Sequence, residues 1–269
     1  LYIVTYADIN GVGPGTYTSF GANLLQELYQ ASLEIASQND RITDAIKRVN
    51  KEKRLTNDPE FTHLSKIEQK KVLSIESNLF FFKHTPSEII NISKEAFQCQ
   101  TFTYQLDMEG GLIIHIFRKI PLNLGYLLGK LSYLDVASMD IFTLFDGIKY
   151  FKIEFLQRPL EGTMEQIEMI VEEAFDMSKK LVLPKPIIKP NEITLECDHS
   201  INYAQLNLTT ANQRGLLAYF VQCFDEANIN IATAKIHTNK NIARDHFLIE
   251  KQNRMCDNAR EIIDKLVGE

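Results

Sequence analysis

Two stretches decide the fold: Leu-Ile-Ile-His-Ile-Phe at residues 112–117 and Ala-Gln-Leu-Asn-Leu-Thr at residues 204–209. The first is rich in β-branched and large apolar residues, which favour a strand, and the second begins a segment with the same order of elements. A helical pattern follows each of them. The sequence therefore predicts an internal repeat of two small α/β units with a period of about 90 residues.

The first unit continues after a break at Pro121. Leucines at helical spacing then predict a helix of about three turns: Leu124, Leu127, Leu128, Leu131 and Leu134. Strands over residues 136–145 and 148–156 flank Asp146-Gly147, which is a hairpin signal. A last helix carries the apolar residues Met164, Ile167, Ile170, Val171, Ala174 and Phe175. The predicted order is strand, helix, strand, strand, helix.

The second unit repeats this order. A helix over residues 216–227 is predicted to bury Leu217, Phe220, Val221 and Phe224. Strands over 229–238 and 243–251 form a hairpin across Asn239-Lys240-Asn241, and a final helix carries Ala259, Ile262, Ile263 and Leu266. Each unit alone buries little surface, so we expect the two units to pair.

The remaining segments complete the predicted domain organisation. Residues 1–100 are predicted to be helical, with an apolar face made by Phe20, Leu24, Leu25, Leu28 and Tyr29, and with Thr56 or Asp58 suited to begin a helix. Residues 101–183 form the first unit, 184–192 a proline-rich linker, and 193–269 the second unit. The predicted class is α+β, with antiparallel sheets and the helices of each unit on one sheet face.

Composition excludes several classes of function. The chain has 269 residues, 45% of them hydrophobic, and a net charge of −6, which disfavours nucleic-acid binding. No apolar run is long enough to cross a membrane. The four cysteines are far apart and form no CxxC pair, which predicts reduced thiols in a cytoplasmic protein rather than a disulfide framework. The chain begins at Leu1 without Met and looks like a segment of a longer protein.

Three places in the chain resemble one known family, the bifunctional uridylyltransferase/uridylyl-removing enzymes that modify the PII signalling protein. Thr5-Tyr6-Ala7-Asp8-Ile9 followed by Leu24-Leu25-Gln26-Glu27-Leu28-Tyr29 resembles the end of that family's HD domain. Phe82-Lys83-His84-Thr85-Pro86 is similar to its F-x-x-H-S/T-P segment. Two repeated units then end the chain, as ACT domains do in the family. The resemblance implies two ferredoxin-like βαββα (ACT-type) units after the helical segment.

The resemblance also implies a function. It suggests the regulatory C-terminal part of such an enzyme, which would sense glutamine or another small amino acid and control PII modification in nitrogen signalling by allostery. The parent protein would be a nucleotidyltransferase and phosphodiesterase with a divalent metal, Mg or Mn. In this chain only Asp8 matches the HD metal set, so no catalytic residue, complete metal site or cofactor is expected here. A dimer through the ACT units is a further expectation.

The ligand site is expected at the turn between the first strand and the first helix of the second unit. There Asn212, Gln213, Gly215 and Leu216 stand in the place of the family's D-x-P-G-L-L-A motif. The unpaired N–H groups of a helix N-terminus can receive a ligand carboxylate. An ordinary strand-to-helix turn explains Gly215 equally well.

Departures from the family pattern keep a second hypothesis open. Asn212 and Arg214 replace the family's Asp and Pro, and the first unit has Lys119-Ile120-Pro121-Leu122 at the matching turn. The first unit is therefore expected to be the poorer site and mainly structural. The alternative function is a non-catalytic ACT-type interaction or dimerisation module of another metabolic regulator.

Overall fold

The computed structural model describes residues 40–108, 110–160, 162–200, 202–227, 229–239, 241–251, 256 and 259–267. Its contacts divide the chain into residues 1–46 and residues 47–269, and the second part is one compact unit. The predicted apolar face at residues 20–29 and Asp8 lie outside the described residues. The account below concerns the unit of residues 47–269.

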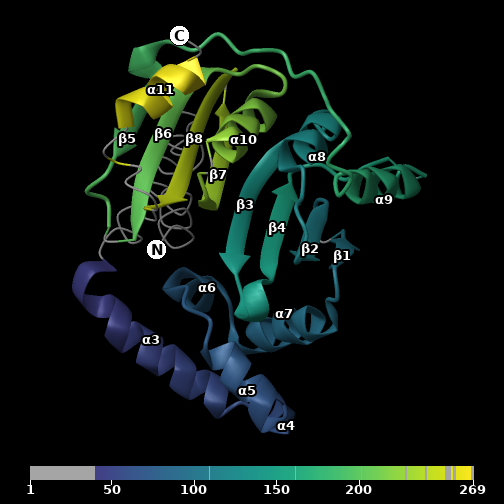
Figure 1. Cartoon of the computed structure of the whole chain (residues 1–269), viewed down its shortest axis with the longest axis vertical. Helices are drawn as coiled ribbons and strands as arrows, with labels where there is room; N and C mark the ends of the chain where they lie inside the picture. Colours follow the sequence, from purple (N-terminus) through teal and green to yellow (C-terminus); the bar gives the residue numbers. More distant parts are fainter. Residues whose placement is uncertain are drawn as a thin grey trace, which may run out of the picture. The chain divides into compact units, whose positions relative to one another are not determined.

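An eight-stranded, fully antiparallel sheet forms the centre of this unit (Figure 1). The α+β class and the antiparallel pairing are as predicted. The strands lie in the order β1-β2-β4-β3-β7-β8-β6-β5. Their bounds are β1 Phe102–Asp107, β2 Ile113–Arg118, β3 Val136–Thr143, β4 Lys149–Phe155, β5 Ile193–Glu196, β6 Tyr203–Ala211, β7 Ile231–Asn239 and β8 Ile242–Glu250.

The same order of elements occurs twice along the chain. In each half two strands, a helix, a hairpin and a second helix follow one another, with helices α8 Leu124–Lys130, α9 Met164–Glu173, α10 Leu216–Glu226 and α11 Ala259–Val267. Both hairpins carry a register shift at the same place, between Val136 and Ser138 and between Ile231 and Thr233. The sequence-based prediction lacked the two leading strands, β1 and β5, of which β5 has only 4 residues.

One detail of the first half differs from the prediction, and another agrees with it. Helix α8 ends at Lys130, although Leu131 and Leu134 are buried in the same core as the helical leucines. The last two leucines of the predicted helix therefore reach the core from the turn that follows α8. The β3–β4 connection does contain the expected tight turn, with Asp146 and Gly147 at φ of 54° and 71°.

The two halves join along one seam, where β3 pairs with β7. Ser138, Met139 and Asp140 pair with Lys235, Ala234 and Thr233. Above this seam α8 contacts α10. A Cβ at Gly125 would meet Gln222 Cβ at 3.2 Å, so the glycine lets the two helices approach closely.

In the part of the chain that the structure describes, helices pack on one face of both halves of the sheet and on both faces of the first half. One face and helices α8–α11 share a large apolar core that runs through both halves. The opposite face of the first half, at β2, β3 and β4, packs against a helical connector and forms a second core. The connector consists of α3 Asp40–Thr56, α4 Pro59–His63, α5 Lys66–Leu73, α6 Asn78–Lys83 and α7 Pro86–Gln98.

Local sequence signals explain why the connector breaks into short helices. Asp58 caps α4, with Pro59 in its first turn, as the sequence suggested. Ser65 and Thr85 begin α5 and α7 with complete capping boxes. The apolar sides of these helices then pack on the sheet, and Phe80 and Phe81 are fully buried.

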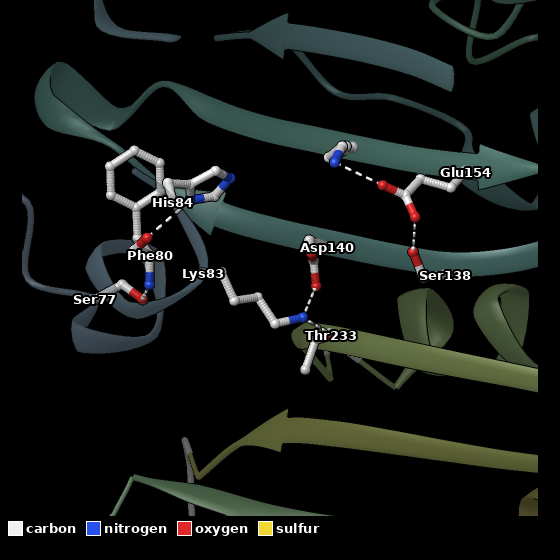
Figure 2. A network of polar contacts seen from close by, with 9 residues as sticks. Ser77, Phe80, Lys83, His84, Ser138, Asp140, Glu154 and Thr233 are labelled. Carbon is white, nitrogen blue, oxygen red and sulfur yellow. Dashed lines mark hydrogen bonds and ion pairs between the residues drawn. The ribbon is translucent and has the colours of Figure 1, made fainter. Parts of the chain in front are cut away.

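Lys83 fastens the connector to the seam (Figure 2). Lys83 is the last residue of α6. Its Nζ forms an ion pair with Asp140 of β3 and donates a hydrogen bond to Thr233 Oγ1 of β7 at 3.0 Å. The next residue, His84, is buried between the rings of Phe142 and Tyr150. The Phe-Lys-His-Thr-Pro segment is thus a structural attachment in this chain.

A disulfide joins Cys197, directly after β5, to Cys256. The prediction of four reduced thiols was therefore wrong. The sequence does not reveal this pair, because the two cysteines are 59 residues apart in the chain and only the fold brings them to a Cα–Cα distance of 5.9 Å. Cys99 and Cys223 are free and buried. Across the part of the chain that the structure describes, no helix combines the length and apolar character needed to cross a bilayer.

Replacing Lys83 with Met should lower the free energy of unfolding by about 1–2 kcal/mol, because it removes the cation from a carboxylate whose side chain is 13% exposed. Urea unfolding followed by circular dichroism measures this. Lys94→Met is the matched control, because Lys94 pairs with Glu60 on the surface and should contribute less than about 0.5 kcal/mol. Equal effects of the two substitutions would contradict the attachment at the seam.

The disulfide gives a second prediction. Replacing both Cys197 and Cys256 with Ser should lower the free energy of unfolding by about 2–4 kcal/mol, because the cross-link restricts the unfolded chain. Thiol titration of the unreduced protein in denaturant should find two reactive groups, Cys99 and Cys223. Four reactive groups in the freshly purified, unreduced protein would show that the pair is not formed.

Candidate functional site

A pocket of about 210 Å³ lies where the two halves meet at the N-terminus of α10. This volume is below the range of about 300–1,000 Å³ that is usual for drug-sized molecules, so the pocket suits a smaller ligand. Both halves line it: Leu128, Ser132, Leu134, Asp135 and Val136 from the first, and residues 212–218, Ile236, Thr238, Ala243 and Asp245 from the second.

All four residues that the sequence suggested as ligand contacts line this pocket: Asn212, Gln213, Gly215 and Leu216. They form the turn from β6 into α10. The Asn212 N–H donates to the Asn241 carbonyl at 2.8 Å, and the Leu216 N–H donates to the Gln213 carbonyl at 3.1 Å. Asn212 is exposed, whereas Leu216 is buried.

Gly215 is needed for its backbone conformation. It caps α10 at φ +80°, a left-handed region that side chains with a Cβ rarely adopt. A Cβ there would meet only Pro184, at 3.8 Å, so lack of space does not require the glycine. The left-handed turn lets α10 begin beside the pocket, where the first N–H groups of a helix have no intrahelical partner.

Gln213 holds the linker instead of pointing freely into the pocket. Its side-chain oxygen accepts from the Ile187 N–H at 2.8 Å, and its side-chain nitrogen donates to the Ile187 carbonyl at 3.0 Å. These two bonds reproduce the pairing of a backbone strand. We therefore assign Gln213 to the wall of the pocket, with its polar group already satisfied.

The first half supplies the opposite wall. Arg214 Nε donates to Ser132 Oγ at 3.3 Å and bridges the two halves at the rim. Asp135 is exposed, and its carboxylate and backbone N–H both bond the side chain of Gln157. The pocket thus exists only when both halves are in place.

Asp245 is the residue that sequence reasoning missed. It lies on β8 between the buried residues Ala243 and Phe247, is 2% exposed, and lines the pocket. A backbone hydrogen bond from His237 reaches the carboxylate, but Oδ1 has no hydrogen-bond partner. Burial raises the pKa of Asp245 to about 7, and the His237 bond lowers it only in part. The alternation Ala243, Asp245, Phe247, Ile249 along β8 was the available signal, because it places an acid on the core face.

The first half has no matching acid. Counting from the shared register shifts, Ser138↔Glu154 corresponds to Thr233↔Leu248, so Phe151 occupies the position of Asp245. Phe151 is buried in the apolar core, and the Arg118 guanidinium lies over its ring at 5.2 Å. An aromatic ring and a cation thus take the place of the carboxylate.

A larger polar groove of about 580 Å³ lies on the other face of the sheet, between α7 and strands β1, β2 and β4. His115 Nδ1 and the Tyr150 hydroxyl bond each other there at 2.8 Å. Burial lowers the pKa of both His84 and His115, which favours neutral imidazoles. The groove holds both acids and bases, including Glu88, Asp107 and Lys152, and shows no preference for one sign of charge.

Metal ligands are not brought together in the part of the chain described. Among those residues, no group of three or more His, Cys, Asp or Glu could hold a metal ion. Asp8, the residue expected to be a metal ligand in the parent enzyme, lies outside them. The metal prediction therefore stays a prediction.

Comparison with known proteins adds no family to this geometry. No protein-family model matches the chain. No curated protein shows significant sequence similarity to it.

Asp245 should make stability depend on pH. Its folded-state pKa of about 7 lies above the ordinary 3.8, so the folded protein holds a proton that the unfolded chain releases. This contribution is fully present at low pH and is lost as the pH rises through about 7. The free energy of unfolding of Asp245→Asn minus that of wild type should therefore rise between pH 5 and pH 8, by an amount on the order of 2 kcal/mol.

Urea unfolding at the two pH values measures this difference. Asp135→Asn makes the same chemical change at an exposed position and should leave the pH dependence of wild type in place. If Asp245→Asn and wild type lose stability in parallel between pH 5 and pH 8, the carboxyl is not a strained buried acid.

Proposed function

We propose that this chain is the regulatory C-terminal part of a PII uridylyltransferase/uridylyl-removing enzyme and senses glutamine or another small amino acid. In this proposal the two halves are ACT-type domains of ferredoxin-like topology. The observation that carries it is the pocket at the N-terminus of α10, which both halves build and which contains the residues of the family-like turn.

The topology supports this assignment. In each half, the strand before the helix pairs with the second strand of the hairpin, as in β2–β4 and β6–β8. The hairpin's first strand then lies on the far side, which is the split arrangement of ferredoxin-like units. Pairing of β3 with β7 places the two helices side by side over the seam.

The seam also offers a route from the pocket to the connector. Val136 of β3 and Ile236 of β7 line the pocket, while Asp140 and Thr233 of the same two strands bond Lys83. A ligand that binds one spacing of these strands better than another would bias the position of α6. Such differential affinity is what ligand control of an enzyme requires.

The other parts of the proposal concern the whole enzyme. It would act in the cytoplasm on PII, with Mg or Mn bound in the HD domain through Asp8 and further ligands. The chain itself would be non-catalytic. A simple interaction module is the alternative, and thermal unfolding in the presence of free amino acids separates the two, because only a sensor is stabilised by a ligand.

Asn212→Asp should bind glutamine more tightly than wild type. A carboxylate forms a charge-assisted bond to an ammonium group, which is stronger than the neutral bond of an amide by about 1 kcal/mol, or roughly fivefold in affinity. Isothermal titration calorimetry with glutamine measures the change.

Asn241→Asp is the matched control, because Asn241 faces the same turn through its backbone but does not line the pocket. It should leave the affinity unchanged within about a factor of two. Tight binding by wild type that neither substitution alters would place the ligand elsewhere.

A further inference from the structure

Asp245 is a buried carboxylate with one unpaired oxygen, and it lines the pocket. We propose that Asp245 anchors the ammonium group of the ligand, so that the pocket selects a small zwitterionic α-amino acid. This inference rests on the proposed function for the presence of an amino acid, and it adds the residue and the charge pattern that recognise it.

Features of opposite charge preference line the same pocket. Helix α10 begins at Gly215, where the positive end of the helix dipole and the first-turn N–H groups favour a carboxylate. Arg214 adds a cation at the rim. Asp245 of β8 also lines this pocket and favours a cation. A molecule with a carboxylate and an ammonium on one carbon matches both features.

The unpaired oxygen is the feature that points to a ligand. A buried polar atom without a partner destabilises a protein, so it calls for a physical explanation. Arg118 Nε is the other buried side-chain atom without a hydrogen-bond partner in the described residues. The stacking of the Arg118 guanidinium over the Phe151 ring explains it. Asp245 has no comparable contact, and a cation in the pocket would supply it.

The surroundings favour a cationic partner over a second protein group. The cross-strand neighbours of Asp245 are Leu208 of β6 and Ile236 of β7, and both are apolar. Arg214 from α10 and Asp135 from the α8–β3 connection are the other charged side chains in the pocket lining, and each already has a hydrogen-bond partner. An ammonium group donates three bonds and can use Oδ1 fully.

The test compares glutamine with glutaramate, which has the same side-chain amide and carboxylate but a hydrogen in place of the ammonium. Calorimetry is done with wild type, Asp245→Asn and Asp135→Asn, at pH 6 and pH 8. Wild type should bind glutamine at least tenfold more tightly than Asp245→Asn does, and glutaramate weakly. Asp135→Asn should bind like wild type. Affinity of wild type for glutamine should rise from pH 6 to pH 8, because a cation binds the ionised carboxylate, and Asp245→Asn should lack this rise.

The outcomes separate the two proposals. If Asp245→Asn binds glutamine within twofold of wild type, or glutaramate binds as tightly as glutamine, the anchoring role is wrong while the sensor survives. If wild type binds none of the twenty amino acids, both fail. Should Asp245→Asn not fold, the comparison of the two ligands and the pH dependence in wild type still decide.

Discussion

The pairing of β3 with β7 is the interaction on which the rest of the structure depends. It consists of three residue pairs, yet it turns two four-stranded halves into one sheet. Without this pairing, β3 and β7 would each be the edge strand of a four-stranded sheet, with unpaired N–H and C=O groups. The pairing also sets α8 against α10, and Gly125 allows their close approach. The pocket is a consequence of this geometry.

The two halves share one backbone arrangement but carry different side chains at matching positions. Where the second half has Asp245 and Ala243, the first half has Phe151 and Lys149. The ring of Phe151 fills its core position, and Lys149 donates to Asn230 at 3.2 Å. The shared backbone arrangement therefore does not by itself give the two halves the same chemistry. In the second half a buried acid lines a pocket that also contains the start of α10, and the first half has an aromatic ring at the matching position.

The opposite face of the sheet shows why the helical connector matters. From Lys47 onward the connector belongs to the same compact unit as the first half, and its residues share a core with β2, β3 and β4. Lys83 reaches both seam strands from this side, while the pocket opens on the other. The two seam strands therefore carry the contacts of Lys83 on one face of the sheet and line the pocket on the other.

The sequence by itself determined the class of the fold, the two strand-helix-strand-strand-helix repeats, the Asp146-Gly147 turn, and the place of Gly215 at the start of a helix. These features follow from local spacing and backbone preference, which neighbouring residues control. Tertiary structure alone decided the β3–β7 seam, the Cys197–Cys256 bond and the position of Asp245 in the pocket. Each of these joins residues far apart in the chain, and their proximity depends on which distant strands pair with one another, which no local pattern encodes.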